Sequence, residues 1–536
     1  MRTENEIIRT TTNDYLDKTS PLPDINTIEQ EILEQIRYTI QAENVQLPKG
    51  YTYKPPKKLP YPCIAACMQR LYKIKQISFL DNPDARNAEL AIYQEYGKDK
   101  GIYITDENYF ANIIRQFDYR IDKKGIQEVL TILKEEAEVV TPCNDPDLIA
   151  VNNGIFNYKT KRLDDFDPEV VFTCKSHVNY VPNPVNPVLH NDEDGTDWDV
   201  ESWVNELSDN PEIDELIWQM LGAIIRPNVN WDKAIFLYSE QGNNGKGSLC
   251  ELMRNLCGSG NYASISINSF AKQFTLTALT RVSAVITDEN PTGAFTKEMD
   301  SFKCAVTGDT FVTDRKYEQP IMIRFRGLIV QCINDLPRTG DRTESFYRRQ
   351  LFIPFEKCFT GKERKYIKHE YLRNPEVLEY VLHKVLHSDF YEFIEPEACR
   401  RLKEEYKETN DPVRQFLTEL LPELAWDLVP WQFLYDLYHE WCIRNVPSGQ
   451  CLSKDTFIRE VRNILIADAD WHVTANAVPP SDMMDSPEPL IATWNLSNWK
   501  NPAYNGYDIV KMCRPPLKSS YKGIVRNVRK GAGAKS

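Results

Sequence analysis

The sequence predicts an α/β protein whose central domain is built on a parallel sheet. Three short apolar segments support this prediction, and the first is followed by a glycine- and asparagine-rich loop and a helix that begins near Lys246. The segments are residues 234–238, 282–286 and 328–333. Because 536 residues exceed what one compact core can hold, about three or four domains are expected.

The chain before this domain divides into an N-terminal arm with a linker, residues 1–62, and a mixed helical and strand region, residues 63–230. The arm is polar and acidic, and its end is rich in proline and lysine, which favours an extended conformation. In the mixed region, apolar spacing predicts helices over residues 65–96, 108–138 and 198–225. Alternation around an Asn-Gly turn predicts short strands within residues 148–180, and prolines predict a loop over 182–197.

The central domain spans residues 231–395 and is followed by a last domain, residues 396–510, and a basic tail, residues 511–536. The tail carries eight Lys or Arg and no acid, whereas the first 510 residues carry 56 basic and 78 acidic side chains. An acidic body therefore ends in an arm that can attract phosphates. A solubilising tail explains these charges equally well.

The composition excludes several classes of protein. Hydrophobic residues make up 42% and charged residues 26%, which is typical of a globular chain rather than a disordered or collagen-like one. No apolar run reaches the roughly 20 residues of a membrane helix, and residues 1–12 lack a secretion signal, so a cytoplasmic protein is expected. The 13 cysteines contain no CxxC pair, which argues against a disulfide or zinc framework.

The loop after the first apolar segment is the clearest sign of chemistry. Glycines let backbone N–H groups turn inward around a phosphate, and a lysine supplies charge for the β- and γ-phosphates of ATP. The usual P-loop pattern is altered, because Glu240 stands at the first glycine and a glycine stands where Ser or Thr binds Mg²⁺. A plain glycine turn is the alternative. The predicted loop residues are Gly242, Asn243, Asn244, Gly245, Lys246, Gly247 and Ser248, the last being the candidate hydroxyl for Mg²⁺.

Polar residues flank the other apolar segments. Asp288 and Glu289 follow the second, where one acid can hold Mg²⁺ and the other can orient and deprotonate the attacking water. Asn334 follows the third and can reach the γ-phosphate. Arg348 and Arg349 precede a further apolar strand and are candidates for an arginine finger that reaches a neighbouring subunit. Solvated surface is the alternative for this pair.

The order of these motifs resembles superfamily 3 helicases. The pattern includes Thr307-Gly308-Asp309 before a basic and aromatic hairpin, and Arg-Arg before Ile353-Pro354-Phe355. It is most similar to the phage and plasmid primase–helicase group, related to poxvirus primase–helicases, over about residues 148–465. The resemblance implies a hexameric ring of AAA+ modules that uses ATP and Mg²⁺ to move 3′ to 5′ on single-stranded DNA, with residues 63–230 as an oligomerisation collar.

The resemblance also assigns roles by position. Lys246 corresponds to the P-loop lysine, and Asp288 and Glu289 correspond to the acidic Walker B pair. Asn334 corresponds to the sensor, and Arg349 matches the trans-acting arginine best, with Arg348 as second candidate.

Two regions are predicted to contact DNA. At the hairpin tip, Lys316 can pair with a phosphate and Tyr317 can stack on a base of a single strand, beside Arg315. Without the resemblance, a surface turn with ordinary charges would be the favoured interpretation of this tip. The last domain resembles the winged-helix module of such helicases, and Ser453 should cap a helix that runs to about Leu465. Its predicted core face is Phe457, Val461, Ile464 and Leu465. The candidates for duplex contacts are Lys454, Arg459 and Arg462 on this helix and Lys522, Arg526, Arg529 and Lys530 in the tail. Solvated surface charges are the alternative for the three helix residues.

The sequence therefore predicts an ATP-dependent DNA helicase that initiates replication of a phage or other mobile element. Its expected partners are origin DNA, copies of itself, and a separate primase or polymerase. No primase activity of its own is predicted, because only Asp145 and Asp147, in an apparent loop, suggest paired carboxylates before residue 148. The alternatives are a P-loop ATPase that serves as a DNA-bound regulator or assembly clamp, and a non-enzymatic origin-binding protein.

Overall fold

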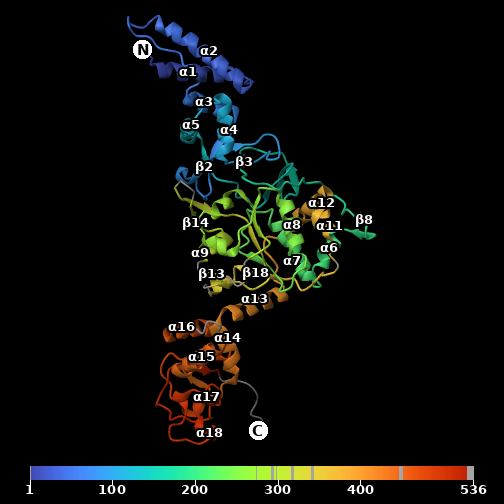
Figure 1. The fold of residues 1–536 in the computed structure, drawn as a ribbon, viewed down its shortest axis with the longest axis vertical. Coiled ribbons are helices and arrows are strands. Elements are labelled where there is room, and N and C mark those ends of the chain that lie inside the picture. Colours follow the sequence, from blue (N-terminus) through green and yellow to red (C-terminus); the bar gives the residue numbers. More distant parts are fainter. Residues whose placement is uncertain are drawn as a thin grey trace. The chain divides into compact units, whose positions relative to one another are not determined.

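The computed structural model divides the chain into two compact units, residues 1–400 and 401–536 (Figure 1). Within the residues that it describes, no helix combines the length and apolar character needed to span a membrane. The described residues are 2–272, 274–290, 295–296, 299–314, 319–339, 343–361, 363–445, 451–466 and 468–527.

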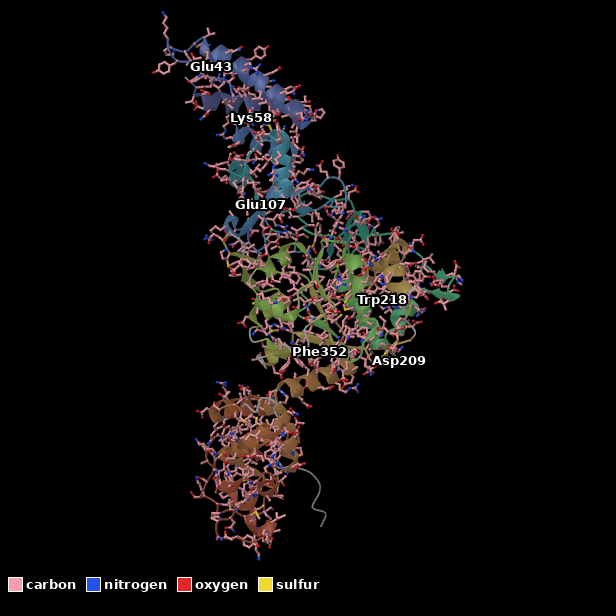
Figure 2. All side chains as sticks on the ribbon, viewed as in Figure 1. Glu43, Lys58, Glu107, Asp209, Trp218 and Phe352 are labelled. Atoms are coloured by element: carbon pink, nitrogen blue, oxygen red, sulfur yellow. The ribbon has the colours of Figure 1, made fainter. Side chains whose placement is uncertain are left out.

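Three helices open the first unit and give the predicted arm a packed core. They are α1 (Glu4–Lys18), α2 (Ile25–Asn44) and α3 (Tyr61–Leu71), drawn in blue in Figure 1. Isoleucines recur at every fourth position of α2 and are fully buried, so a few apolar residues in an acidic sequence suffice for one helix face. These isoleucines are Ile28, Ile32, Ile36 and Ile40. Lys58, labelled in Figure 2, lies within the proline-rich segment and pairs with Asp118 at 2.7 Å.

The predicted helix over residues 65–96 is wrong beyond α3. Residues 74–93 instead form β1 (Ile74–Ser78) and β2 (Ala88–Tyr93), which pair antiparallel. Pro83 and Asp84 stand between the two apolar runs and break the helical pattern there, which is why the chain reverses. The sheet has the order β3-β2-β1-β4, with β3 at Tyr103–Ile104 and β4 at Val139–Val140.

Helices α4 (Glu107–Phe117) and α5 (Lys123–Glu136) confirm the helical prediction over 108–138. The prediction of short strands within 148–180 is also confirmed, as an antiparallel sheet of three strands. These strands are β5 (Leu148–Val151), β6 (Gly154–Asn157) and β7 (Arg162–Asp164).

The predicted loop over 182–197 contains a hairpin. Its strands are β8 (Leu189–Asn191) and β9 (Thr196–Trp198), and a cross-strand pair joins His190 Nδ1 and Asp197 at 2.7 Å. The helical prediction over 198–225 is confirmed as α6 (Val200–Glu206) and α7 (Pro211–Ala223).

The centre of the first unit is a five-stranded parallel sheet of order β11-β12-β16-β10-β18, which confirms the predicted α/β class. Its three inner strands lie where the apolar segments predicted them: β10 (Ala234–Tyr238), β12 (Ala284–Thr287) and β16 (Leu328–Ile333). The outer strands are β11 (Tyr262–Ala263) and β18 (Gln350–Pro354).

Both faces of this sheet are covered by helices. On one face, α8 (Lys246–Cys257), α7 and α12 (Pro375–Leu386) share one apolar core with the strands. On the other, the rings of Phe236 and Phe352 stack 5.0 Å apart near α9 (Asp300–Thr307), and Phe352 is labelled in Figure 2. The carboxyl ends of the parallel strands therefore form an edge at which loops can build a site.

A hairpin leaves the sheet after α9, as the sequence predicted. Strands β14 (Thr310–Thr313) and β15 (Ile321–Arg324) pair antiparallel, whereas the predicted tip, 315–317, lies outside the described residues. The remaining elements of this part are β13 (Phe295–Thr296), β17 (Arg338–Thr339), α10 (Glu344–Tyr347), α11 (Lys365–His369) and α13 (Glu397–Asn410).

The second unit combines helices with a three-stranded antiparallel sheet in which β21 (Gly523–Arg526) is the middle strand. Residues 523–526 of the predicted tail therefore belong to the folded unit, because Ile524 of this apolar segment is fully buried. The outer strands are β19 (Leu428–Pro430) and β20 (Trp471–Val473). The helices are α14 (Pro412–Leu420), α15 (Trp431–Asn445), α16 (Lys454–Leu465), α17 (Leu490–Thr493) and α18 (Ile509–Met512).

Candidate nucleotide-binding site

The loop from β10 to α8 has the backbone that its glycines and asparagines permit. Gly245 has φ +88° and precedes the first residue of α8, and a Cβ there would lie 2.4 Å from Leu207 Cδ2. Only glycine fits both the conformation and the space. The Asn244 side chain closes the loop, because its Nδ2 donates to the Gln241 carbonyl and its Oδ1 accepts the Lys246 N–H at 3.3 Å.

Lys246 begins α8 and directs its ammonium to the carboxyl edge of the sheet. Its Nζ donates to Asn334 Oδ1 at 2.8 Å and to the carbonyls of Ile333 and Ser239 at 3.1 and 3.3 Å. The side chain is only 6% exposed, and burial lowers its pKa. The structure thus brings together Lys246 and Asn334, two of the predicted site residues.

Asp288 follows β12 and is held by a residue that the sequence did not single out. Arg254 of α8 contacts both carboxylate oxygens, at 2.8 and 3.2 Å. This guanidinium lowers the Asp288 pKa. The neighbouring Glu289 is exposed. Arg254 carries no signal in the sequence, because a basic residue eight positions after Lys246, on a predicted helix, usually lies at the surface.

Oxygen donors that suit a hard cation follow β12 and lie on the first turn of α8. Asp288 and Glu289 supply carboxylates, and Ser248 supplies a half-buried hydroxyl on the first turn of α8. Oxygen ligands are what Mg²⁺ takes in proteins, so this donor set fits the ion. Gly247, by contrast, offers no side chain.

The two predicted finger arginines lie away from this loop. Strands β10 and β18 are parallel, with Ala234 opposite Gln350 and Tyr238 opposite Pro354. Arg349 therefore lies at the amino end of the sheet, about 13 Å along the strands from the edge that carries the loop. Its Nη1 donates to Ser345 Oγ at 2.8 Å, and Arg348 is exposed beside it.

A cavity of about 180 Å³ opens beside the first turn of α8. Ser248 and Gly245 form one wall, Trp203 and Leu207 another, and Lys368 of α11 closes it. The charges of segment 363–369 are typical of a surface segment, so the sequence does not predict its position beside the loop.

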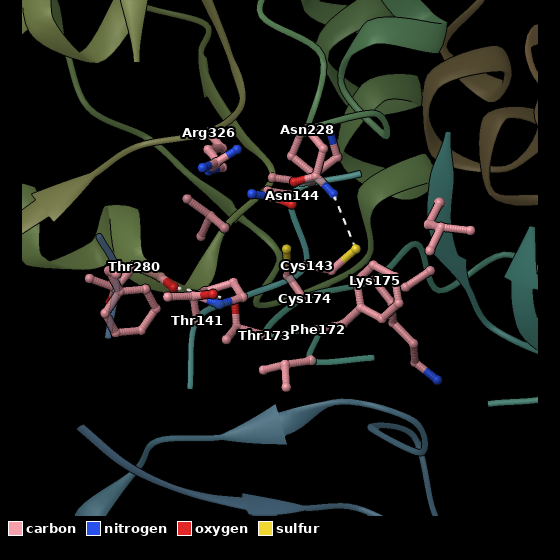
Figure 3. Close-up of a pocket in the computed structure, with 18 of the residues that line it drawn as sticks. Thr141, Cys143, Asn144, Phe172, Thr173, Cys174, Lys175, Asn228, Thr280 and Arg326 are labelled. Atoms are coloured by element: carbon pink, nitrogen blue, oxygen red, sulfur yellow. Dashed lines mark hydrogen bonds between the residues drawn. The ribbon is translucent and has the colours of Figure 1, made fainter. Parts of the chain in front are cut away.

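A second cavity of about 80 Å³ lies elsewhere in the first unit, and none of the predicted site residues lines it (Figure 3). Asn228 Nδ2 contacts Cys143 Sγ at 3.9 Å, and burial raises the pKa of the neighbouring Cys174 thiol to about 12. Burial therefore favours the protonated form of this thiol, which is a poor nucleophile.

In the second unit, α16 matches its predicted course. Ser453 caps it, and Phe457, Val461 and Leu465 are buried, whereas Ile464 is half-buried. Lys454 donates to Gln432, the Arg462 guanidinium lies 5.8 Å from the Trp431 ring centre, and Arg459 is exposed.

The tail candidates differ in their surroundings. Lys522 is exposed. Arg526 instead donates to the Leu424 carbonyl at 2.7 Å and pairs with Asp427 at 3.4 Å, so the unit itself holds its side chain. Arg529 and Lys530 lie outside the described residues.

Three family models match the chain. Residues 82–232 match a model described as D5 N terminal like, and residues 408–476 match one described as poxvirus D5 protein-like. Residues 237–349, which include the loop and the acidic strand, match a family of unknown function. A search of curated proteins finds no match.

Among solved structures, the chain is similar to the apo C-terminal region of NrS-1. One such structure is 14% identical with a TM-score of 0.43, and the match covers 87% of this chain and 100% of that chain. Another apo structure of this region is 14% identical with a TM-score of 0.39, and the match covers 81% of this chain and 90% of that chain. A JCV helicase with a bound small molecule is 17% identical with a TM-score of 0.25, covering 46% and 64%.

Proposed function

Because the chain carries the D5-type domains of phage and poxvirus primase–helicases, we propose that it is an ATP-dependent DNA helicase that acts in replication. The observation that supports this most is the meeting of Lys246 Nζ and Asn334 Oδ1 at the carboxyl edge of a parallel sheet. Asp288 follows the adjacent strand β12. This constellation is suited to hold and hydrolyse a triphosphate.

In the proposed mechanism, the N–H groups of the loop and the first turn of α8 surround the phosphates of ATP. Lys246 is already at the strand edge and offsets charge on the β- and γ-phosphates, exchanging its present oxygen partners for phosphate oxygens. Glu289 accepts a proton from the attacking water, and Asn334 orients that water against the γ-phosphate. Ser248 and Asp288 are the residues to hold Mg²⁺, which when bound neutralises phosphate charge.

The position of Arg349 supports a site shared between subunits. Its place at the opposite edge of the sheet keeps it from the loop of its own subunit, whereas a neighbour in a ring can present that edge to the loop. The strand order, with β10 between β16 and β18, is compatible with the AAA+ module that the resemblance implies. We therefore propose a hexameric ring, with Arg349 as the finger and Arg348 as the second candidate.

DNA contacts are proposed for two parts of the chain. The β14–β15 hairpin carries Arg315, Lys316 and Tyr317 and would grip a single strand during 3′ to 5′ movement. The second unit, with its helices and three-stranded sheet, is proposed to be a winged-helix module that binds duplex origin DNA through α16. A replication initiator of a phage or another mobile element is the role that unites these parts.

The decisive experiment measures ATP turnover and strand displacement on a tailed duplex, with the molecular mass determined in the same buffer. Wild-type protein should unwind the duplex as an oligomer. Lys246→Ala should abolish turnover, and Glu289→Gln should bind ATP without hydrolysing it. ATP turnover without strand displacement, on duplexes with either a 3′ or a 5′ tail, would instead indicate a regulator or clamp. Duplex binding without ATP turnover would indicate an origin-binding protein.

A further inference from the structure

Gly247 stands where a P-loop usually has the Ser or Thr that holds Mg²⁺, and a lysine lies against this glycine. A Cβ built on Gly247 would lie 3.4 Å from Lys368 Nζ. Lys368 comes from α11, more than 100 residues later in the chain, and lines the 180 Å³ cavity with Ser248 and Gly245. An ammonium group thus lies within reach of the space that the missing side chain would have filled.

The two lysines approach the start of α8 from different directions. Successive positions of a helix point about 100° apart, so Lys246 and the position of Gly247 face different sides. Lys246 turns to the strand edge at Asn334, which is the place of the β- and γ-phosphates. Lys368 instead faces the first turn of α8, whose N–H groups receive the phosphates nearer to the ribose.

Lys368 is also free to bind an anion. Within the described part of the chain its ammonium has no hydrogen-bond or ion-pair partner, whereas Arg364 of the same cavity is paired with Glu206 at 2.5 Å. Asp288 is near enough for Lys368 to contribute, after Arg254, to its lowered pKa. An unpaired, half-buried cation beside a phosphate loop is placed to interact with the bound nucleotide.

We propose that Lys368 binds the α- and β-phosphates of the nucleotide. Its ammonium supplies there part of the positive charge that Mg²⁺, held by a hydroxyl at position 247, would otherwise supply. This inference rests on the proposed function, because it assumes that the loop binds ATP. It implies that ADP and ATP are bound through Lys368 alike and that a part of this affinity does not require Mg²⁺.

The test is a titration of fluorescent ADP, with competition by ATP, in Mg²⁺ and in EDTA. Lys368→Ala should weaken both nucleotides about tenfold in either buffer, and Lys368→Arg should retain most of the affinity. Lys159→Ala, an exposed lysine in the β6–β7 turn, is the matched control. Unchanged affinity in Lys368→Ala overturns the inference, and so does loss of affinity that Lys368→Arg shares. Failure of the wild type to bind any nucleotide would instead reject the proposed function.

A second variant tests whether the charge of Lys368 takes the place of Mg²⁺ held at position 247. Gly247 does not have positive φ, so Gly247→Ser is compatible with the helix. In the Lys368→Ala background it should restore affinity in Mg²⁺ but not in EDTA, because the new hydroxyl acts only through the ion. If the nucleotide affinity recovered equally in EDTA, or did not recover in Mg²⁺, the result would contradict the inference that the Lys368 ammonium replaces a metal ion held at position 247. The KM for ATP should rise with the Kd for ADP, while kcat falls less than in Lys246→Ala.

Discussion

Replacing Arg349 by alanine tests whether the ATP site spans two subunits. The side chain lies at the amino end of β18, and the loop lies past the carboxyl end of the parallel strand β10. The four residue steps between these ends span about 13 Å, and the sheet itself separates them. A guanidinium so placed can act on a γ-phosphate only if that phosphate belongs to another subunit.

The size of the effect follows from this geometry. Loss of an arginine finger lowers kcat by about 10³-fold or more, which corresponds to about 4 kcal/mol of transition-state stabilisation. ATP binding should change little, because no contact joins Arg349 to the residues of the loop within the described structure. The expected variant binds nucleotide normally and turns it over at no more than about a thousandth of the wild-type rate.

Mixing supplies the quantitative assay. Arg349→Ala has an intact loop, and Lys246→Ala has an intact finger, so neither variant alone has a complete interface. In a randomly assembled one-to-one mixture, about a quarter of the interfaces join the intact loop to the intact finger. Co-expressed, co-purified mixtures should therefore recover about a quarter of wild-type ATP turnover if interfaces act independently.

Arg120→Ala provides the control, because the Arg120 side chain is exposed and its guanidinium lies 5.0 Å from the centre of the neighbouring Tyr119 ring, while its hydrogen bond to Asp118 is made by the backbone N–H, which alanine keeps. It should retain wild-type turnover. A mixture that recovers nothing, although mass measurement shows that both variants share oligomers, would refute the shared site. A fully active monomer would refute it as well.

Three further outcomes are expected. Asp81→Ala should lower strand displacement more than ATP turnover, because Asp81 fixes Arg324 at the root of the hairpin and also pairs with Arg326 at 2.6 Å; equal losses in both assays would contradict this. Deleting residues 528–536 should lower the slope of log affinity for duplex DNA against log salt concentration by up to about three units. Deleting residues 511–536 should instead unfold the second unit, as measured by circular dichroism, because it removes β21. Burial lowers the pKa of Lys175 from 10.5 to about 8, so between these values the unfolded chain binds more protons and the contribution of Lys175 to the unfolding free energy rises with pH. In urea unfolding, this rise of the unfolding free energy with pH should be absent from Lys175→Met. Identical pH profiles for the wild type and the variant would refute the prediction.

The central sheet could be predicted because its strands are buried on both faces. Strands β10, β12 and β16 read as continuous apolar runs, and this pattern requires no knowledge of their neighbours. The placement of Lys246 near Asn334 followed in turn, since parallel strands end at one edge. Local pattern and global arrangement agree here.

Other features depend on contacts between distant residues. Arg254 lies 34 positions before Asp288, and Lys368 lies still farther from Gly247, so only the folded chain brings these charges together. The α1–α2 pair was missed for a related reason, because its few isoleucines are diluted by acidic residues. In each case the sequence alone does not distinguish a charge that has a partner in the fold from one on a solvated surface.

The middle position of β21 has a consequence for how the second unit acquires its structure. Strands β19 and β20 each pair only with β21 among the described strands, and Leu428 meets Val525 across almost one hundred residues. Until that segment has been synthesised, both strands keep unpaired edges, and closing so long a loop slows folding. A ribosome that stalls within this unit would thus release a chain whose first unit has a complete sheet, but whose second unit offers open strand edges to aggregation and proteolysis.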